Sequence, residues 1–228
     1  MSVELLVCHD IRAAHWKLGP LPPTYGNLSL LGWSQTPPAW NAGVPFEIQC
    51  VLSQALTAET KVAFPSVVND VRNNQLKPCE GNDLQFLRHK TIWYSIKAAL
   101  FNRRSCDALI ITQRPALVCR LFNDAGYPWH LQGHVVLLFA KDADLPLIDH
   151  RIICNLCGDN WSRAAYTMVD AGLLGVLRPG VDGDVAGLLA LDKDFQNRFF
   201  QILRQQAEYS SIPCTIVDET ILQDRLRE

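Results

Sequence analysis

Apolar and polar positions alternate along the chain in blocks that predict strands and helices in turn. Short apolar runs typical of buried strands occur at "ELLVC", "CDALIIT", "HVVLLFA" and "PCTIVDE". Longer segments with apolar residues at helical spacing lie between them. This alternation favours βαβ units, so we expect an α/β fold, a three-layer sandwich with a mostly parallel sheet.

The clearest helical pattern follows Asp192, a residue type that caps helices, in the segment "DKDFQNRFFQILRQQAEYSS". Its apolar face consists of Phe195, Phe199, Ile202 and Leu203. The other helices are predicted at "PFEIQCVLSQAL", residues 83–101, "RPALVCRLFNDAG", "DNWSRAAYTMVDAGLLG" and "TILQDRLRE".

A Pro-rich region at about residues 18–45 interrupts this pattern. The stretches "GPLPPTYGN" and "WSQTPPAWNAG" carry repeated Pro and Gly, which mark turns and exclude long helices. We expect a single domain, residues 1–228, in which 18–45 is an irregular lid or insertion. A non-enzymatic alternative is an interaction protein whose Trp- and Pro-rich segment 20–45 docks a partner.

Composition limits the classes of partner. The 228 residues are 48% hydrophobic and 19% charged, which suits a chain with a sizeable core. The formal net charge of −2 gives no general attraction to nucleic acid or to anionic membranes. No uncharged apolar run approaches the roughly 20 residues that span a bilayer. Most of the eight cysteines lie in or beside apolar segments, so we expect reduced thiols and a cytoplasmic protein.

The candidate binding residues follow the predicted strands, because ligands of parallel sheets bind beyond the carboxyl ends of the strands. After the first strand, "CHDIRAAHWKLGP" offers Asp10, Arg12 and Lys17 as ligand-binding residues. Lys17 would contact a phosphate as a point charge. A base would stack on Trp16, Trp33 or Trp40, although these aromatic side chains can equally be packing residues.

Two carboxylates follow "HVVLLFA". Asp142 and Asp144 could hold a divalent metal, Mg²⁺ or Mn²⁺, that bridges nucleotide phosphates, as in metal-dependent glycosyltransferases. That class, acting on nucleotide sugars, is an alternative function. A solvated strand end followed by a turn would explain the same two residues.

Cysteine and histidine positions suggest two further sites. In "CGDNWSR", Cys157 precedes Arg163 by the spacing of the phosphate-binding loop in Cys-based phosphatases. A zinc site could instead use "CNLC" and the nearby histidines, and buried thiols with hydrogen-bonded histidines are the structural alternative. The residues of the zinc alternative are His130, His134, His150, Cys154 and Cys157.

The order of "VVNDVRNNQL", "DALIITQR", "HVVLLFAKDADLP" and the last helix–strand–helix segment resembles P-loop nucleotide and nucleoside kinases related to nicotinamide-riboside kinases. The resemblance implies a protein that binds a nucleotide, nucleoside or other phosphorylated small molecule. It implies that Asp70 and Arg72 face the acceptor and that Asp142 and Asp144 take a metal or a ribose hydroxyl. Phosphate would be neutralised by Arg114, Arg163 and Lys17.

Two departures from that family leave phosphotransfer open. The chain has no Gly-Lys pair, so the Walker A pattern that wraps a phosphate in backbone N–H groups is missing. Gln113 stands where the family has an acidic residue after the central strand, while Arg114 stays in register. The resemblance therefore implies either a catalytically inactive binding protein or an enzyme with a rebuilt site.

Overall fold

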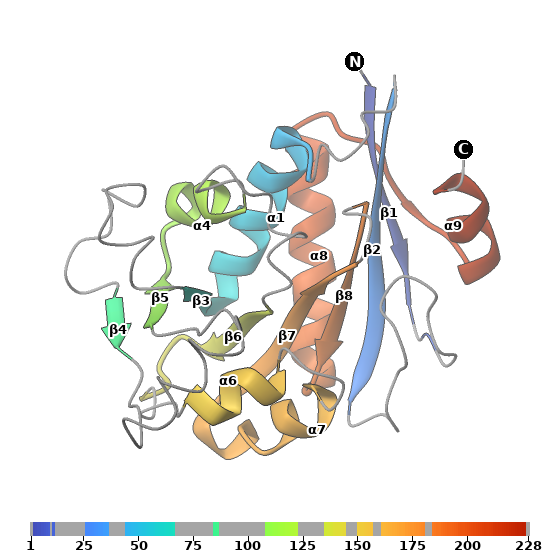
Figure 1. Ribbon diagram of the computed structural model, residues 1–228. Helices are drawn as coiled ribbons and strands as arrows, with labels where there is room; N and C mark the ends of the chain where they lie inside the picture. The colour runs from blue at the N-terminus through green and yellow to red at the C-terminus, as the bar shows by residue number, and fades with distance from the viewer. Residues whose placement is uncertain are drawn as a thin grey trace, which may run out of the picture.

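A computed structural model of the chain describes residues 2–9, 11, 26–36, 44–66, 84–86, 108–122, 135–144, 150–156, 161–180 and 184–226. These residues form a mixed α/β structure in which helices lie on both faces of one twisted sheet (Figure 1). Among them, no helix is long and apolar enough to cross a membrane.

The described strands join in the order β4-β5-β3-β6-β7-β8-β2-β1-β9. Their bounds are β1 Ser2–Cys8, β2 Asn27–Thr36, β3 Thr60–Ser66, β4 Leu84–Phe86, β5 Ala108–Thr112, β6 Val136–Ala140, β7 Leu173–Pro179, β8 Val185–Ala190 and β9 Cys214–Ile216.

The strand directions contradict the predicted mostly parallel sheet. Every neighbouring pair of described strands is antiparallel except β1 and β9, which run parallel with Leu5 opposite Cys214. The connection from β7 to β8, residues 180–184, shows the physical reason. A parallel pair needs a crossover of about a dozen residues or more, so this short link permits only an antiparallel hairpin.

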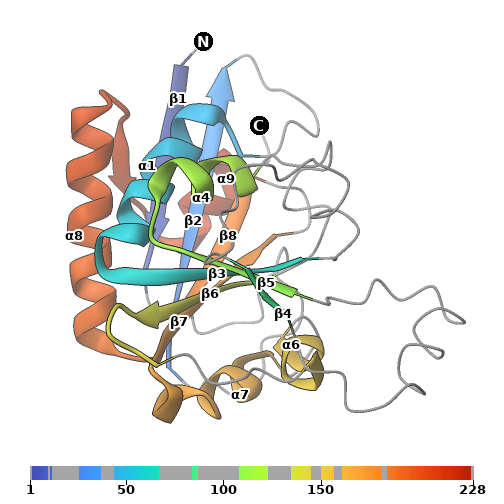
Figure 2. The ribbon, with the colours of Figure 1, turned by 90° about the vertical axis from the view of Figure 1, so that its left-hand side faces the viewer.

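Helices cover each face of the sheet. On one face lie α1 (Phe46–Glu59), α4 (Pro115–Leu121) and α8 (Lys193–Tyr209), and on the other lie α6 (His150–Leu156), α7 (Trp161–Tyr166) and α9 (Glu219–Arg225). A short 3-10 helix, η3 (Val169–Ala171), precedes β7. Figure 2 shows α8, α1 and α4 stacked along one side of the strands and α6 and α7 away from them.

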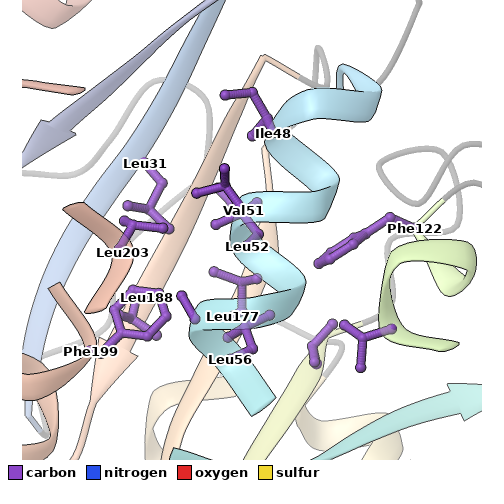
Figure 3. Close-up of a cluster of buried hydrophobic side chains, with 14 of the residues drawn as sticks. Leu31, Ile48, Val51, Leu52, Leu56, Phe122, Leu177, Leu188, Phe199 and Leu203 are labelled. Carbon is purple, nitrogen blue, oxygen red and sulfur yellow. The ribbon is translucent and has the colours of Figure 1, made fainter. Parts of the chain in front are cut away.

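The core is divided between the two faces. Strand β1 places Leu5 and Val7 in one buried cluster and Leu6 and Cys8 in the other, as expected from the alternation of side chains along a strand. The first cluster lies under α1, which packs between α8 and α4 (Figure 3). Figure 3 draws its members Leu31, Ile48, Val51, Leu52, Leu56, Phe122, Leu177, Leu188, Phe199 and Leu203.

Several predicted elements are confirmed. Helix α8 begins after Asp192, whose carboxylate accepts a hydrogen bond from the Phe195 backbone N–H. Phe195, Phe199 and Leu203 are buried, as their spacing predicts, and Ile202 is partly buried. The apolar runs predicted as strands form β1, β5, β6 and β9, and helices α1, α4 and α9 lie within or overlap their predicted segments.

Other predictions are wrong at the level of elements. Residues 27–36, inside the predicted lid, form β2, which lies in the sheet between β8 and β1. The predicted helix at 83–101 contains the strand β4, and its residues 87–101 lie outside the described part. The segment "GLLG", residues 172–175, is predicted as the end of a helix, but its last three residues begin β7. An apolar run of this length has no period that separates helix from strand.

Candidate functional site

The strands that carry the sequence-predicted site residues point to one edge of the sheet. Through the alternating antiparallel pairs, β5, β6 and β8 run in the same direction as β1, and β9 runs parallel to β1. The residues after these strands therefore share an edge, even though most of the strands are not neighbours.

Sharing an edge does not bring these residues together. β6 lies four places from β1 in the sheet, which at about 4.8 Å per strand separates them by roughly 19 Å. β5 lies six places from β1, or roughly 29 Å. Arg114, after β5, and Asp142, after β6, thus belong to a different part of the edge from the loop after β1.

The carboxylates after β6 lie in a turn at the surface. Asp142 and Asp144 are both exposed, and the Lys61 ammonium donates a hydrogen bond to the Ala143 carbonyl between them, at 2.9 Å. In the described part of the chain no three His, Cys, Asp or Glu side chains gather as a metal site would require. A metal at Asp142 and Asp144, and the glycosyltransferase function that needs it, stay predictions.

The predicted phosphate ligands with described positions are far apart in the fold. Arg114 precedes α4, where its backbone carbonyl accepts hydrogen bonds from the N–H groups of Leu117 and Val118. Arg163 is exposed on α7, on the opposite face of the sheet. Trp33 is buried in the core at 4% exposure, so it packs and offers no ring to a ligand.

The remaining predicted residues lie outside the described part, and their roles stay predictions. They are Asp10, Arg12, Trp16, Lys17, Trp40, Asp70, Arg72, His130, His134 and Cys157. The side chains of His150 and Cys154 are likewise outside it. Neither the phosphatase-like loop at Cys157 nor the zinc alternative is tested.

A groove of about 530 Å³ lies along one side of α8, the helix at the left-hand side of Figure 2. Among the described residues, His9, which directly follows β1, lines the groove from outside the helix. The His9 ring meets the Phe200 ring edge-on, with 4.4 Å between the ring centres. The helix contributes Lys193, Gln196, Asn197, Phe200, Gln201, Arg204, Gln205 and Glu208.

A buried amide holds α8 against the sheet beneath the groove. Gln196, only 2% exposed, donates through Nε2 to the Ser29 hydroxyl of β2 at 2.8 Å. Its Oε1 accepts a hydrogen bond from the Lys193 ammonium, also at 2.8 Å. A buried amide without hydrogen-bond partners would destabilise the fold. The bond to the Gln196 Oε1 therefore also fixes the position of the Lys193 ammonium in the groove.

The groove carries both charge and amide groups. Lys193 and Arg204 are cationic, and Glu208 opposes them near the end of the helix. Burial raises the pKa of the Cys214 thiol in β9, and the nearby Arg204 guanidinium partly opposes this shift. Helix α8 itself packs against β9, the strand beside β1 in the sheet.

Sequence reasoning identified α8 by its apolar face and assigned nothing to the opposite face. The sequence feature that could have indicated the groove is the stripe Lys193, Asn197, Gln201 and Arg204. A solvated helix face often has pairs of opposite charges at this spacing, whereas here the two middle residues are amides. His9 belongs to the charged loop after β1, and of the two described residues of that loop, His9 and Ile11, it is His9 that lines the groove.

Comparisons with protein-family models, with curated proteins and with solved structures found no match to this chain.

Proposed function

We propose that the chain binds a nucleotide or a similarly phosphorylated small molecule in the groove along α8. The observation that carries this proposal is the partly exposed His9 ring, held edge-on against the buried Phe200 ring, in a groove that also contains Lys193 and Arg204. An aromatic surface beside cations matches the two halves of such a ligand, a flat base and an anionic phosphate.

The amides add the remaining chemistry. Asn and Gln side chains each offer a carbonyl acceptor and an NH₂ donor, the pair of groups that the edge of a nucleobase requires. Asn197 and Gln201 are exposed on the groove side of α8, one turn apart. They can therefore contact a base edge or ribose hydroxyls while the His9 ring provides the aromatic contact.

The cations lie within reach of a bound phosphate. Phe200 lies between Lys193 and Arg204 along α8, about 10 Å along the axis from the first and about 6 Å from the second. The proposal concerns binding. Phosphate transfer, which the kinase resemblance implies, would need Asp70, a residue outside the described part, and stays a prediction.

Isothermal titration calorimetry with a panel of nucleosides, nucleoside mono-, di- and triphosphates and inorganic phosphate tests the proposal. We expect a phosphorylated nucleoside to bind more tightly than both the nucleoside and inorganic phosphate. Arg204→Gln should weaken that binding roughly 10- to 100-fold, the equivalent of a lost hydrogen bond to a charged group, about 1.5–3 kcal/mol.

Arg198→Gln is the matched control, because Arg198 lies on the same helix but pairs with Glu59 of α1 at 3.1 Å instead of lining the groove. This control should leave the dissociation constant unchanged. Absence of binding by every phosphorylated compound, or equal losses in the two variants, would contradict the proposal.

A further inference from the structure

Two cysteines meet where α1 packs against α4. Cys50 of α1 and Cys119 of α4 have their sulfur atoms 3.5 Å apart, with one thiol donating a hydrogen bond to the other. Both side chains are half-buried and neither is in a disulfide. The two helices lie side by side in Figures 1 and 2, so the contact belongs to a packed interface.

The folding of the chain makes this contact. Helix α1 leads directly into β3, and α4 closely follows β5, the antiparallel neighbour of β3. The end of α1 and the start of α4 therefore lie at the same edge of the sheet, and both helices lie on the same face. Two residues that are 69 positions apart in sequence are thereby brought together.

The surroundings of the pair distinguish its members. Cys119 also contacts Gln49, whose carbonyl Oε1 lies 3.9 Å from the Cys119 sulfur and accepts its S–H. Burial, and then the neighbouring Cys50 sulfur, raise the pKa of the Cys119 thiol to about 11. Because Gln49 accepts the S–H of Cys119 and so favours its protonated form, we assign the first attack to Cys50.

We propose that Cys50 and Cys119 are a redox-active dithiol, which a hydroperoxide converts into a disulfide that joins α1 to α4. The sulfurs need to approach by about 1.5 Å to reach bonding distance, a movement that side-chain rotation can supply. This site is separate from the groove along α8 and does not rest on its function.

The reaction balances with hydrogen peroxide as the oxidant. The Cys50 thiolate attacks one peroxide oxygen, the O–O bond breaks, and Cys50 sulfenic acid and water form after a proton is taken up. The Cys119 sulfur then attacks the sulfenic sulfur, loses its proton and expels the hydroxyl group as a second water. Two thiols lose two electrons and two protons, and one peroxide is reduced to two waters.

The link would tie together the two ends of a long stretch of chain. It encloses β3, β4 and β5 in one covalent loop, because they lie between the two cysteines in sequence. A cross-link of this length restricts the unfolded chain strongly. The oxidised protein should therefore melt several degrees above the reduced protein.

The test treats the reduced full-length chain with a small excess of hydrogen peroxide at neutral pH, blocks the remaining thiols by alkylation and measures intact mass. The expected product has lost two thiols, with a mass about 2 Da lower before alkylation, and regains them with dithiothreitol. Peptide mapping must assign the link by fragmentation, because the tryptic peptide "SCDALIITQRPALVCR" contains Cys106 as well as Cys119.

Cys119→Ser and Cys214→Ser are the matched variants, since Cys214 is another half-buried thiol without a cysteine partner among the described residues. Cys119→Ser should abolish the link, and Cys214→Ser should form it at the wild-type rate. A Cys50–Cys119 peptide in the wild-type digest supports the proposal even if a variant folds poorly. Links distributed over other cysteines, or oxidation of Cys50 to sulfinic acid without a link, would overturn it.

Discussion

At the scale of single residues, Gln196 connects the core to the groove. Its amide lies beneath α8, bonded to the Ser29 hydroxyl on one side and to the Lys193 ammonium on the other. The buried hydrogen bond between Gln196 and Ser29 stabilises the fold only while both side chains are present, because the loss of one leaves a buried polar group without a partner.

Gln196→Leu should therefore lower the free energy of unfolding by about 1–3 kcal/mol, measured by urea denaturation. Adding Ser29→Ala to that variant should cost less than Ser29→Ala costs in the wild type, because the hydroxyl has already lost its partner. Gln205→Leu, at an exposed position on the same helix, should change stability by less than about 0.5 kcal/mol. Strict additivity of the two substitutions would contradict the coupling.

Residue types predicted caps and core positions well and predicted the site poorly. Asp192 was identifiable because a cap depends on a few adjacent residues, and the carboxylate acts as predicted. His9 and Phe200 meet across almost the whole sequence. No local pattern reports such a contact, because it depends on how β1 and α8 are placed in the finished fold.

At the scale of elements, α8 is the longest described helix and carries both the core contacts and the groove. Its start is fixed by the Asp192 carboxylate, which satisfies a backbone N–H that would otherwise lack a partner in the first turn. The position of Lys193, the first residue of the helix, depends on this start.

Asp192→Ala should lower the free energy of unfolding by about 1 kcal/mol, whereas Asp192→Asn should retain most of the stability because Asn also caps helices. Asp194→Ala is a suitable control: Asp194 lies in the first turn but makes no cap, so only its interaction with the helix dipole, a few tenths of a kcal/mol, is lost. Chemical denaturation of the three variants measures the difference. Equal effects of Asp192→Ala and Asp194→Ala would show that the cap is unimportant.

The elements that sequence patterns missed share a physical cause. β2 lies between two Pro-rich stretches, and the turn residues around it concealed a strand that pairs with a neighbour on each side. β7 directly follows η3, across Gly172, whose backbone φ of +83° suits glycine and ends the 3-10 turn. Its apolar residues alone could equally continue a helix.

At the scale of the whole molecule, strand direction was not predictable from the apolar runs. A strand buried on both faces has the same composition in a parallel and in an antiparallel sheet, and only the connections decide between them. The parallel pairing of β1 with β9 is secured from outside by Glu4, which accepts hydrogen bonds from Thr215 and from Arg225 of α9.

Helix α9 then covers the second face of the sheet near β2. Leu222 is fully buried, and its side chain lies so close to Gly32 of β2 that a methyl group there would approach it to 2.8 Å. Leu222→Ala should lower the free energy of unfolding by about 2–4 kcal/mol. Ile221→Ala, on the exposed side of the same helix at 44% exposure, should change it by less than about 0.5 kcal/mol. Urea denaturation that gave equal values would mean that α9 does not seal this face.

The pairing of β1 with β9 also has a consequence for biosynthesis. Glu4 and Thr215 are 211 residues apart, so a ribosome that adds 5–20 residues per second needs about 10 s or more between the two strands. The interval between the synthesis of β2 and that of its partner β8 is almost as long, since Asn27 pairs with Ala190. Throughout that interval the emerging chain presents β1 and β2 with apolar side chains on both sides and no completed sheet to cover them. The nascent chain therefore keeps two apolar strands without their later sheet partners until β8 and β9 have been synthesised.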